Sequence, residues 1–589
     1  MSGEPPGLVC LLPNPGESVE PSLRTWGRWR PGELRTVTAA RGRLVVVGQC
    51  LADDDQLRTD FHRALDSADS RLVTRWPGSY LAVVLRPGEL TAYPDLAGQY
   101  PIYYRSAGGR TVVGTHAKAT ARAAGLAGEP DLLTLAAQVF CPAVPMLTDG
   151  RSVLAGLSRV GGGQALRVTP DGRCTKWTYE SLAPDPDVSF AEAADRLRGA
   201  LDDAVRLRAE RAPHLTADLS GGLDSTSVAF LAARHRELPV FTYHQPDAPA
   251  NDLDFAVRYA RLDSRLRSEV VHGTSRTLTY QGMDELGPTD LPDPAVAVRL
   301  RTRAMLRRVA ASGTGVHLGG EGADALLVAA PGYLGDLARH GTLGQLRRDC
   351  FTLARARRVS PASVLTRSTR LSRTTVHRAL HLLADRLERP VDRSVEWLDA
   401  IAWWPRPGTE GGWLSGRMRR ELAELARTAE PVAVAGMGVG DFAALCELRT
   451  TGAVQRQLDE YGREFGVWPQ TPYLDNDVIR ACLALPAWRR ADDAQVFKPL
   501  LGKALTGLVP ADVLARRTKG NYSAEDHRGA RHASAELRTR IAGLRLAELG
   551  VVERAPVLGS LNKAIDGLRT PFAAFNRLLG AELWLAGIE

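Results

Sequence analysis

Residues 219–225 read Leu-Ser-Gly-Gly-Leu-Asp-Ser, and this stretch decides the fold of the chain. The short apolar run at 215–219 predicts a strand, and residues 226–235 predict a helix that begins directly after the stretch. At such a helix N-terminus, glycines let the backbone approach a ligand, while free N–H groups and the helix dipole favour negative charge. The stretch is therefore typical of an anion-binding loop between a strand and a helix.

The residue types of this loop indicate which anion it binds. The Gly-Lys-Ser/Thr ending of a Walker-type loop is missing, because the stretch contains no lysine. Asp224 instead places a carboxylate beside the phosphates, which is favourable only if Mg²⁺ lies between them. The pattern Ser-Gly-Gly-x-Asp-Ser resembles the pyrophosphate loop of enzymes that split ATP between its α and β phosphates. The alternative is a glycine-rich turn without a ligand, but such a turn needs only one or two of these residue types.

The composition indicates a soluble globular protein, since 44% of the 589 residues are hydrophobic and 24% are charged. Two or more domains are expected at this length. No apolar run approaches the roughly 20 residues that cross a bilayer, and the N-terminus has no signal-peptide pattern, so we expect no membrane partner. The seven cysteines are scattered without a C-x-x-C pair, which argues against a zinc ribbon or a disulfide scaffold and favours the cytoplasm.

The net charge of +8 allows three interpretations: a nucleic-acid-binding face, a field that attracts ATP and an acidic peptide, or composition without functional meaning. We favour the last two and expect no nucleic-acid partner, because no long Lys/Arg run stands out. Lysine is scarce, and three of its six positions fall between residues 498 and 519. Lys498 and Lys519 are therefore candidates for a site that needs a compact point charge.

The chain divides into regions of different patterning. Residues 1–183 contain short β-rich segments separated by Gly/Pro turns, whereas helices and strands alternate after residue 190, which predicts a parallel sheet with helices on both faces. Residues 335–465 are rich in Arg and Leu and are expected to be helical. Ser220 and Gly319 each follow a predicted strand, so they can share the carboxyl edge of the sheet, where ligands bind.

A second loop, Gly-Gly-Glu-Gly-Ala-Asp at residues 319–324, repeats the arrangement of a strand that leads into glycines and an acidic residue. Asp324 is a candidate second carboxylate for the metal, and Glu321 would point at the reacting centre. Loops that contain glycines and acidic residues are common, so this segment indicates a binding site only in combination with the first loop.

Together the two loops resemble those of the asparagine-synthetase-like superfamily. Later segments fit the same order, with Pro-Tyr-Leu-Asp at 472–475, then Lys498, then Arg-Arg-Thr-Lys-Gly at 516–520. Four N-terminal segments look like the glutaminase domain of these enzymes, at 76–80, 95–98, 101–104 and 156–163. The resemblance implies an α+β Ntn-glutaminase-like sandwich at 1–183, followed at 184–589 by an α/β ATP-pyrophosphatase (PP-loop) domain with a helical insertion at about 335–465.

The N-terminal region departs from glutamine-using members of this superfamily. They carry a cysteine directly after the initiator Met, where this chain has Ser2, and an Asn-Gly oxyanion hole near 47–48, where it has Val47 and Gly48. A terminal serine can act as a nucleophile, but loss of the oxyanion donor costs about 10²–10³ in rate. We therefore expect a glutaminase fold without glutaminase activity, so that ammonia is not the nucleophile.

Superfamily members with an inactive glutaminase domain include the β-lactam synthetases and the lasso peptide cyclases. The β-lactam enzymes resemble Gly-Tyr-Gly where this chain has Gly320, Glu321 and Gly322, and the long helical region and tail look like those of the cyclases. The resemblance implies an AMP-forming ligase that joins an Asp or Glu side chain of a leader-cleaved precursor peptide to its N-terminal amine. A leader peptidase and a leader-recognition protein would be partners.

Three alternatives remain open for the function. The nearest is a β-lactam synthetase or another asparagine-synthetase-like amide ligase with a small substrate. The others are a tRNA-modifying ATPase with the same loop and a protein that binds partners without catalysis.

The resemblance also implies site roles. ATP and its pyrophosphate would be bound by the first loop and the start of the second, namely Leu219, Ser220, Gly221, Gly222, Asp224, Ser225 and Gly320. Asp224 and Asp324 would hold Mg²⁺. Lys519, or alternatively Lys498, would stabilise negative charge on the phosphate or the tetrahedral intermediate; Lys519 is preferred because it lies in Arg-x-x-Lys-Gly.

Two further expectations concern the base and the substrate cavity. Family members carry an acid four residues before the Pro of Pro-Phe-Leu-Asp, where this chain has Trp468, so Glu321 is the remaining base or orienting group, or else a structural carboxylate. Ordering a peptide costs about 1–2 kcal/mol per residue, which calls for a large shaped cavity. The helical region is where we expect it, lined by Trp403, Trp404 and Trp413 unless these are ordinary core residues.

Overall fold

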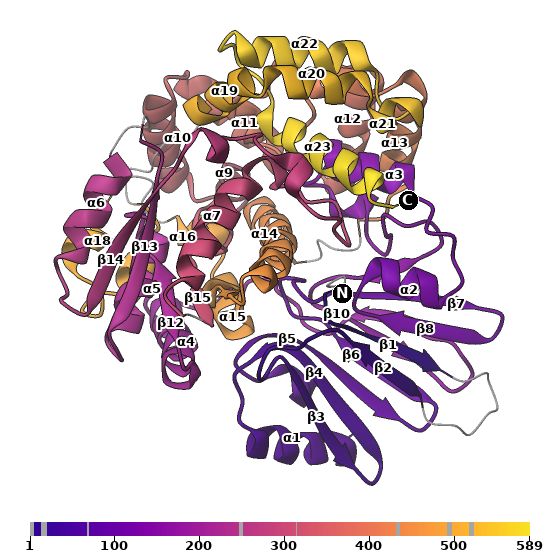
Figure 1. The fold of residues 1–589 in the computed structure, drawn as a ribbon. Coiled ribbons are helices and arrows are strands. Elements are labelled where there is room, and N and C mark those ends of the chain that lie inside the picture. Colours follow the sequence, from indigo (N-terminus) through magenta and orange to yellow (C-terminus); the bar gives the residue numbers. More distant parts are fainter. Residues whose placement is uncertain are drawn as a thin grey trace.

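The computed structural model describes residues 5–12, 21–67, 70–246, 251–313, 315–431, 436–491, 497–516 and 523–588. Ser2 and Lys519 lie outside these described residues. In Figure 1 the N-terminal sheets, in indigo and purple, lie beside a parallel sheet, and yellow helices of the C-terminal region cover the opposite end of the molecule.

Two antiparallel sheets form the N-terminal region, in the orders β2-β1-β8-β7-β9 and β11-β10-β6-β5-β4-β3. They pack around one core, to which both contribute buried residues. Helices α1 (Asp54–Asp66), α2 (Ala117–Ala123) and α3 (Leu132–Phe140) accompany them. The strands are β1 (Gly7–Leu12), β2 (Ser22–Trp26), β3 (Leu34–Ala39), β4 (Gly42–Cys50), β5 (Gly78–Arg86), β6 (Glu89–Tyr93), β7 (Ile102–Ala107), β8 (Arg110–Gly114), β9 (Ser158–Val160), β10 (Gln164–Val168) and β11 (Cys174–Thr178).

Strand β4 is buried on both faces because successive side chains point to opposite sides of a sheet. Val45 and Val47 pack into the core between the two antiparallel sheets. Leu44 and Val46 belong instead to a second core, which also contains residues of the later helices, such as Leu197. The N-terminal sheets are thus fixed against the rest of the chain by a shared apolar core.

The second sheet system is parallel throughout, in the order β14-β13-β12-β15-β16. Its strands are β12 (Leu215–Asp218), β13 (Leu238–His244), β14 (Leu266–His272), β15 (Val316–Leu318) and β16 (Trp468–Gln470). The chain leaves β12 toward β13 and β14 on one side, and later returns as β15 on the other. The order reverses between β12 and β15, and in sheets of this kind ligands bind at that switch point, at the carboxyl ends of the strands.

The sequence-based prediction of this sheet is confirmed at its centre. The strands predicted at 215–219 and 315–318 form β12 and β15, which pair in parallel with Leu215 opposite Val316. Helices α4 (Phe190–Arg211), α5 (Leu223–Ala233), α6 (Asn251–Ala260), α7 (Arg299–Ala310) and α8 (Ala323–Leu327) alternate with the strands. The loops after β12 and β15 therefore share one edge of the sheet, as the alternation predicted.

The region predicted to be helical is helical, and its described residues between 335 and 465 contain no strand. Its α-helices are α9 (Tyr333–Arg339), α10 (Leu343–Arg357), α11 (Pro361–Ser372), α12 (Val376–Glu388), α13 (Gly416–Thr428) and α14 (Val439–Glu464). Past the parallel sheet follow α15 (Asn476–Leu483), α16 (Ala487–Arg490), α17 (Pro499–Ala504), α18 (Ala511–Leu514), α19 (Ser523–His532), α20 (Ser534–Ala542), α21 (Arg545–Glu548), α22 (Arg554–Ile565) and α23 (Phe572–Ala586). None of the helices in the described ranges is long and apolar enough to cross a membrane.

The three tryptophans of this region are core residues, and the expectation that they line a substrate cavity was wrong. All three side chains are buried. Trp403 and Trp404 pack edge-on against Phe442, and Trp413 packs against Phe140 and Phe575. Large aromatic side chains contribute most of the apolar burial in such a cluster, which explains their number in a helical layer.

Candidate active site

The loop after β12 needs glycine at position 221. Gly221 has φ +76°, and a Cβ there would lie 2.3 Å from the carbonyl oxygen of Asp252 in α6. Gly222 is the N-cap of α5, so the first N–H groups of that helix face the end of the sheet. The close approach of the two helices and the left-handed turn both exclude a side chain at 221. The resulting helix N-terminus has the electrostatics of an anion site.

Two serines of the loop are joined by hydrogen bonds. Ser220 Oγ and Ser225 Oγ lie 2.8 Å apart, and Ser225 Oγ accepts from the backbone N–H of Ser220 at 3.2 Å. Ser220 Oγ accepts from the N–H of Gly222, also at 3.2 Å. The two hydroxyls and the helix N-terminus thus form one polar cluster.

The backbone of Leu219 anchors the loop to β13. Its N–H donates to the carbonyl of Phe241, and its carbonyl accepts from the hydroxyl of Thr242.

The loop after β15 lies directly against the first turn of α5. A Cβ on Gly320 would come within 2.5 Å of the backbone nitrogen of Ser225, and a Cβ on Gly322 within 2.8 Å of Leu474 Cδ2. Gly322 also has φ +95°. Because no side chain fits at either position, the loop can bring Asp324 close to Asp224.

Lys498 joins the two carboxylates. Its Nζ lies 2.5 Å from Asp224 Oδ1 and 2.7 Å from Asp324 Oδ1. The lysine side chain has no exposed surface, whereas 20% of the Asp224 side chain and 48% of the Asp324 side chain are exposed. Lys498 has φ +52° and directly precedes α17, a backbone conformation that is costly for a residue with a Cβ. Two acidic side chains from separate turns therefore face one positive charge and remain open to solvent on the other side.

This arrangement fits a Mg²⁺ ion that binds together with a nucleotide. Mg²⁺ in such sites is bound by one or two carboxylates plus substrate phosphates, and it keeps several waters. The ammonium group of Lys498 already shows that both carboxylates direct negative charge at one point. The described residues contain no group of three or more His, Cys, Asp or Glu side chains that could hold a metal, so the remaining ligands would come from phosphate and water.

Glu321 lies beside this site and beside a part-buried polar pair. Solvent reaches its side chain, yet the surrounding protein disfavours the charged carboxylate and raises its pKa to about 7. The negative charges of Asp218 and Asp224 act in the same direction, and His317 opposes them. A carboxyl group with this pKa exchanges protons near neutral pH, as a general base or acid requires.

Comparison with known proteins decides the family. The sequence matches the asparagine synthase family over residues 196–586, which is more than half of the chain. The chain belongs to the asparagine synthase family. The asparagine synthase match supports an ATP-dependent amide ligase. Among curated proteins, none matches the sequence significantly.

Solved structures resemble this asparagine synthase family protein only distantly. The NMN synthetase of Francisella tularensis is 15% identical, with a TM-score of 0.18 over 24% of this chain and 58% of that chain. The glutamine phosphoribosylpyrophosphate amidotransferase of B. subtilis, complexed with ADP and GMP, is 9% identical, with a TM-score of 0.20 over 57% of this chain and 71% of that chain. A structure of the allosteric regulatory enzyme of purine biosynthesis is 11% identical, with a TM-score of 0.19 over 58% of this chain and 72% of that chain. At these TM-scores the likenesses carry no argument about the site.

Sequence reasoning missed a part-buried polar pair beside Glu321 in this asparagine synthase family protein. His317 of β15 lies with Nε2 3.1 Å from Asp218 Oδ1 and with Nδ1 2.7 Å from Thr216 Oγ1, both in β12. These three residues lie inside strands that were identified only by their apolar pattern. The signal was present as a polar residue in each of two strands that are expected to be neighbours.

Arg516 positions the first loop, a role that its sequence neighbourhood alone did not reveal. Its guanidinium donates to the carbonyl of Gly221 and to the carboxylate of Asp252, and it stacks 4.2 Å above the ring of Phe255. A planar guanidinium can make all these contacts at once. Lys519 lies in the segment that follows, outside the described residues, so its role stays a prediction.

The segment Pro-Tyr-Leu-Asp serves the architecture. Asp475 forms two hydrogen bonds, of 2.6 and 2.7 Å, with Arg208 of α4, and both side chains are 2% exposed. Arg208 also donates to Gln470 of β16 and to Gln49 of the N-terminal region. This buried, fully hydrogen-bonded ion pair thus connects α4, the edge of the parallel sheet and the N-terminal sheets.

Proposed function

We propose that this protein is an AMP-forming lasso peptide macrolactam synthetase. It adenylates an Asp or Glu side-chain carboxylate of a leader-cleaved precursor peptide and joins that carboxylate to the peptide's N-terminal amine. The observation that carries the nucleotide chemistry is the convergence of Asp224 and Asp324 on Lys498 at the edge of the sheet that bears the pyrophosphate loop.

In the first step a carboxylate oxygen of the substrate attacks the α-phosphorus of ATP. A new acyl–phosphate bond forms, the bond between the α-phosphorus and the bridging oxygen to the β-phosphate breaks, and pyrophosphate leaves. The N-terminus of α5, with the hydroxyls of Ser220 and Ser225, binds the departing anion. Mg²⁺ held by Asp224 and Asp324 would neutralise charge on the pyrophosphate when bound.

In the second step the N-terminal amine attacks the acyl carbon. The amide C–N bond forms, the acyl–phosphate C–O bond breaks, AMP leaves, and the amine gives up a proton. A peptide α-amine has a pKa of about 7.7–8.0, so on the order of a tenth is neutral at pH 7 and only modest base assistance is needed. Glu321, with a pKa of about 7, is placed to accept the proton. Lys498 balances the negative charge on the oxygen of the tetrahedral intermediate, or Lys519 does.

The N-terminal region supports an amine of the substrate, and not ammonia, as the nucleophile. Val47 packs into the core between the sheets, where an oxyanion-hole asparagine would be needed. The N–H of Gly48 already donates to the carbonyl of Glu33 at 2.8 Å, so it is not free to bind an oxyanion. Neither position provides the electrostatic stabilisation on which glutamine hydrolysis depends.

The proposed partners follow from this activity. They are the precursor peptide, a peptidase that removes its leader and a protein that recognises the leader. All seven cysteines, from Cys10 to Cys482, are free, which suits the reducing cytoplasm where such a pathway would operate.

A β-lactam synthetase or another amide ligase with a small substrate is the second candidate. The burial of Trp403, Trp404 and Trp413 favours it, because these residues do not line a cavity for a long peptide. Both candidates share the adenylation chemistry and differ in the acyl substrate.

Mass spectrometry of a leaderless candidate peptide incubated with the protein, ATP and Mg²⁺ tests the proposal. We expect a product that has lost one water and an equal amount of AMP. Asp224→Asn serves as the inactive control. Formation of ADP would contradict the adenylation chemistry, and pyrophosphate release with small amino acids alone would select the second candidate.

A further inference from the structure

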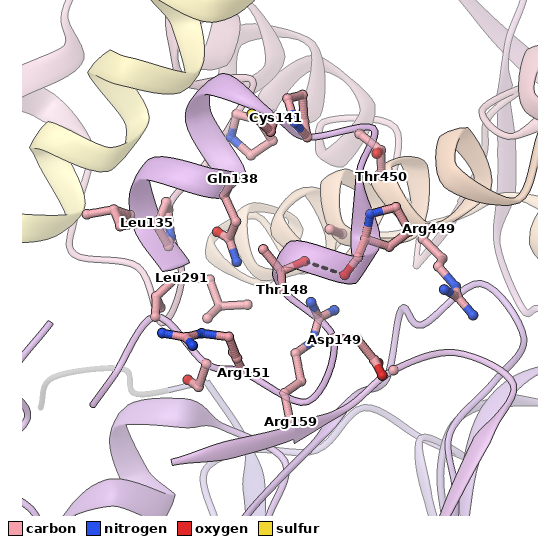
Figure 2. A pocket seen from close by; sticks show the side chains of 18 of the residues that line it. Leu135, Gln138, Cys141, Thr148, Asp149, Arg151, Arg159, Leu291, Arg449 and Thr450 are labelled. Carbon is pink, nitrogen blue, oxygen red and sulfur yellow. Dashed lines mark hydrogen bonds between the residues drawn. The ribbon is translucent and has the colours of Figure 1, made fainter. Parts of the chain in front are cut away.

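A pocket of about 210 Å³ lies where the N-terminal region meets the helices of the asparagine synthase domain (Figure 2). One face of α14 lines it, since Cys446, Arg449, Thr450 and Ala453 follow the i, i+3, i+4, i+7 spacing of a helix face. The opposite wall comes from α3 and the segment that follows it. The pocket is therefore built jointly by both parts of the chain.

Three arginines of this pocket have no acidic partner. Arg159 of β9, Arg449 of α14 and Arg577 of α23 all line it, and none of them forms an ion pair within the described residues. Burial lowers the pKa of Arg449, to which the neighbouring charge of Arg159 contributes, and burial likewise lowers the pKa of Arg577. Acidic groups act on two of these arginines only through space, namely Asp149 on Arg449, and Glu410 and Glu447 on Arg577. Three guanidinium groups that line one pocket without an ion pair in the described residues indicate a place for an anion.

The hydrogen-bonding groups of these arginines are also incompletely used. The Nε groups of Arg159 and Arg449 are buried and have no hydrogen-bond partner among the residues that the structure describes. Arg449 donates through Nη2 to the carbonyl of Gly162, and Arg577 donates through Nε to the carbonyl of Val139. A buried donor without an acceptor is unfavourable by itself, which a bound acceptor would correct.

Two ion pairs also border the pocket. Arg151 binds Asp131 at 2.8 Å, and Asp149 binds Lys176 at 3.0 Å. Neither pair changes the excess of positive charge. In Figure 2, Arg151 and Arg159 lie on one side of the view and Arg449 on the other, with Asp149 between Arg159 and Arg449.

Helix α14 connects the pocket with the adenylation site, because it also packs against α8, the helix that carries Asp324. Solvent reaches the side chain of Glu447 on this helix, yet the surrounding protein disfavours the charged carboxylate and raises its pKa. The negative charge of Asp324 raises this pKa further, and the positive charge of Arg577 opposes the shift. Glu447 thus lies within electrostatic reach of the metal-site carboxylate and of a pocket arginine. From Glu447 to Ala453 the helix rises about 9 Å. A substrate that extends along α14 from Asp324 would reach the arginines.

We propose that this pocket binds a second, non-reacting carboxylate of the acyl substrate, which rests on the proposed function. Arg159, Arg449 and Arg577 would hold it while another carboxylate of the same substrate is adenylated. The volume is below the roughly 300 Å³ at which pockets for whole drug-sized ligands begin, so the pocket accepts one end or side chain of a larger molecule. The planar guanidinium suits a carboxylate, and the neighbouring Leu135, Val139 and Leu291 suit an aliphatic stem.

Arg159→Met is the sharpest variant, because the Arg159 side chain donates no hydrogen bond within the described residues and its loss should not disturb the fold. Arg110→Met, at an exposed position of the same sheet, removes the same charge and is the control. Calorimetric titrations with citrate and with inorganic phosphate, at constant ionic strength and with ATP and Mg²⁺ saturating the nucleotide loop, measure anion binding directly. Thermal melts show that each variant is folded.

We expect citrate to bind at one site in the wild type and in Arg110→Met, and at least about tenfold more weakly in Arg159→Met, as for loss of one charge-assisted hydrogen bond. Equal citrate affinity in Arg159→Met would overturn the subsite. Tighter binding of phosphate than of citrate, lost in the same variant, would also overturn it, in favour of a phosphate ligand.

Steady-state kinetics test whether the pocket binds the substrate during the reaction. For a peptide with a free C-terminal carboxylate, Arg159→Met should raise the peptide KM about tenfold and leave kcat and the ATP KM unchanged, whereas the C-terminal amide should show no such difference. Absence of turnover by the wild-type protein would overturn the proposed function, while an unchanged peptide KM for every acid-bearing peptide would overturn the subsite alone.

Discussion

The carboxylates of Asp224 and Asp324 face the same point, although they follow different strands of the parallel sheet. Asp224 Oδ1 lies 2.5 Å and Asp324 Oδ1 2.7 Å from Nζ of Lys498. The glycines at 221, 320 and 322 make this possible, because each occupies a place where a Cβ would collide with the opposite loop or an adjoining element. Binding of ATP with a divalent cation is the chemistry that uses two such carboxylates and a lysine together.

Replacing Lys498 by methionine should leave two facing carboxylates without their shared cation. We expect AMP formation to slow at least about 10²-fold, as for removal of one electrostatic stabiliser of a transition state. The melting temperature of the variant should depend more on Mg²⁺ than that of the wild type, because the ion replaces the missing charge. Lys503→Met, at an exposed position of the same helix, is the control. Normal AMP formation by Lys498→Met would refute the role.

A methyl group at Gly320 should separate the two loops. Its Cβ would lie 2.5 Å from the backbone nitrogen of Ser225, so either the second loop or the start of α5 must move. We expect a loss of about 1–3 kcal/mol in unfolding free energy, as for overpacking, together with a marked loss of ATP affinity. Gly502→Ala, which meets nothing within 4 Å and lies inside α17, should leave the ATP affinity unchanged and should not lower the unfolding free energy, because alanine favours a helix more than glycine does. Denaturant unfolding and nucleotide titration measure both.

The pH dependence of amide formation should contain the titration of Glu321. Its pKa of about 7 in the folded protein is above the usual value of 4.5, so the base form is reached only as pH rises through about 7 and the rate should rise with it. The groups that face Glu321 are Asp218 and Asp224, which raise this pKa, and His317, which lowers it. In Glu321→Gln the rise of the rate near pH 7 should disappear, and only the titration of the substrate amine should remain. If the rise near pH 7 persists unchanged in this variant, it belongs to the substrate amine and not to Glu321.

The same shift makes a prediction for stability. The folded protein binds the proton of Glu321 more tightly than the unfolded chain does, so this group favours the native state at acid pH and loses that contribution as pH rises from about 4.5 to about 7. Unfolding experiments should show a smaller decline over this interval for Glu321→Gln than for the wild type. Identical curves would mean that Glu321 has an ordinary pKa.

Arg516 should affect ATP binding without taking part in the chemistry. In Arg516→Lys a single ammonium cannot contact the Gly221 carbonyl, Asp252 and the Phe255 ring together, so the loop loses part of its support. We expect the ATP KM to rise about tenfold, with a smaller change in kcat. Steady-state kinetics separate the two parameters, and an unchanged ATP KM would argue against a positioning role.

The sequence predicted the parts of the site that are local in the chain. Strand, glycine turn and helix follow one another at 215–235, and the carboxyl ends of neighbouring parallel strands meet at one edge, so the approach of Asp224 to Asp324 could be anticipated. The helical region could be anticipated from its composition and from the absence of strand patterns in its sequence.

The parts that could not be predicted depend on tertiary contacts. Lys498 reaches the carboxylates from a left-handed position before Pro499, and nothing in its sequence neighbourhood indicates that direction. The ion pair of Arg208 with Asp475 joins segments far apart in the chain. Burial of Trp403 is decided by packing against Phe442, which periodicity alone does not distinguish from a cavity wall.

The most direct test of the account is a crystal structure of the protein with ATP and Mn²⁺, in which anomalous scattering locates the metal. The account predicts a single peak bound by the carboxylates of Asp224 and Asp324 and by phosphate oxygens, with the pyrophosphate portion of ATP at the N-terminus of α5. A metal bound without either carboxylate, or a nucleotide whose phosphates lie away from Ser220 and Ser225, would contradict it.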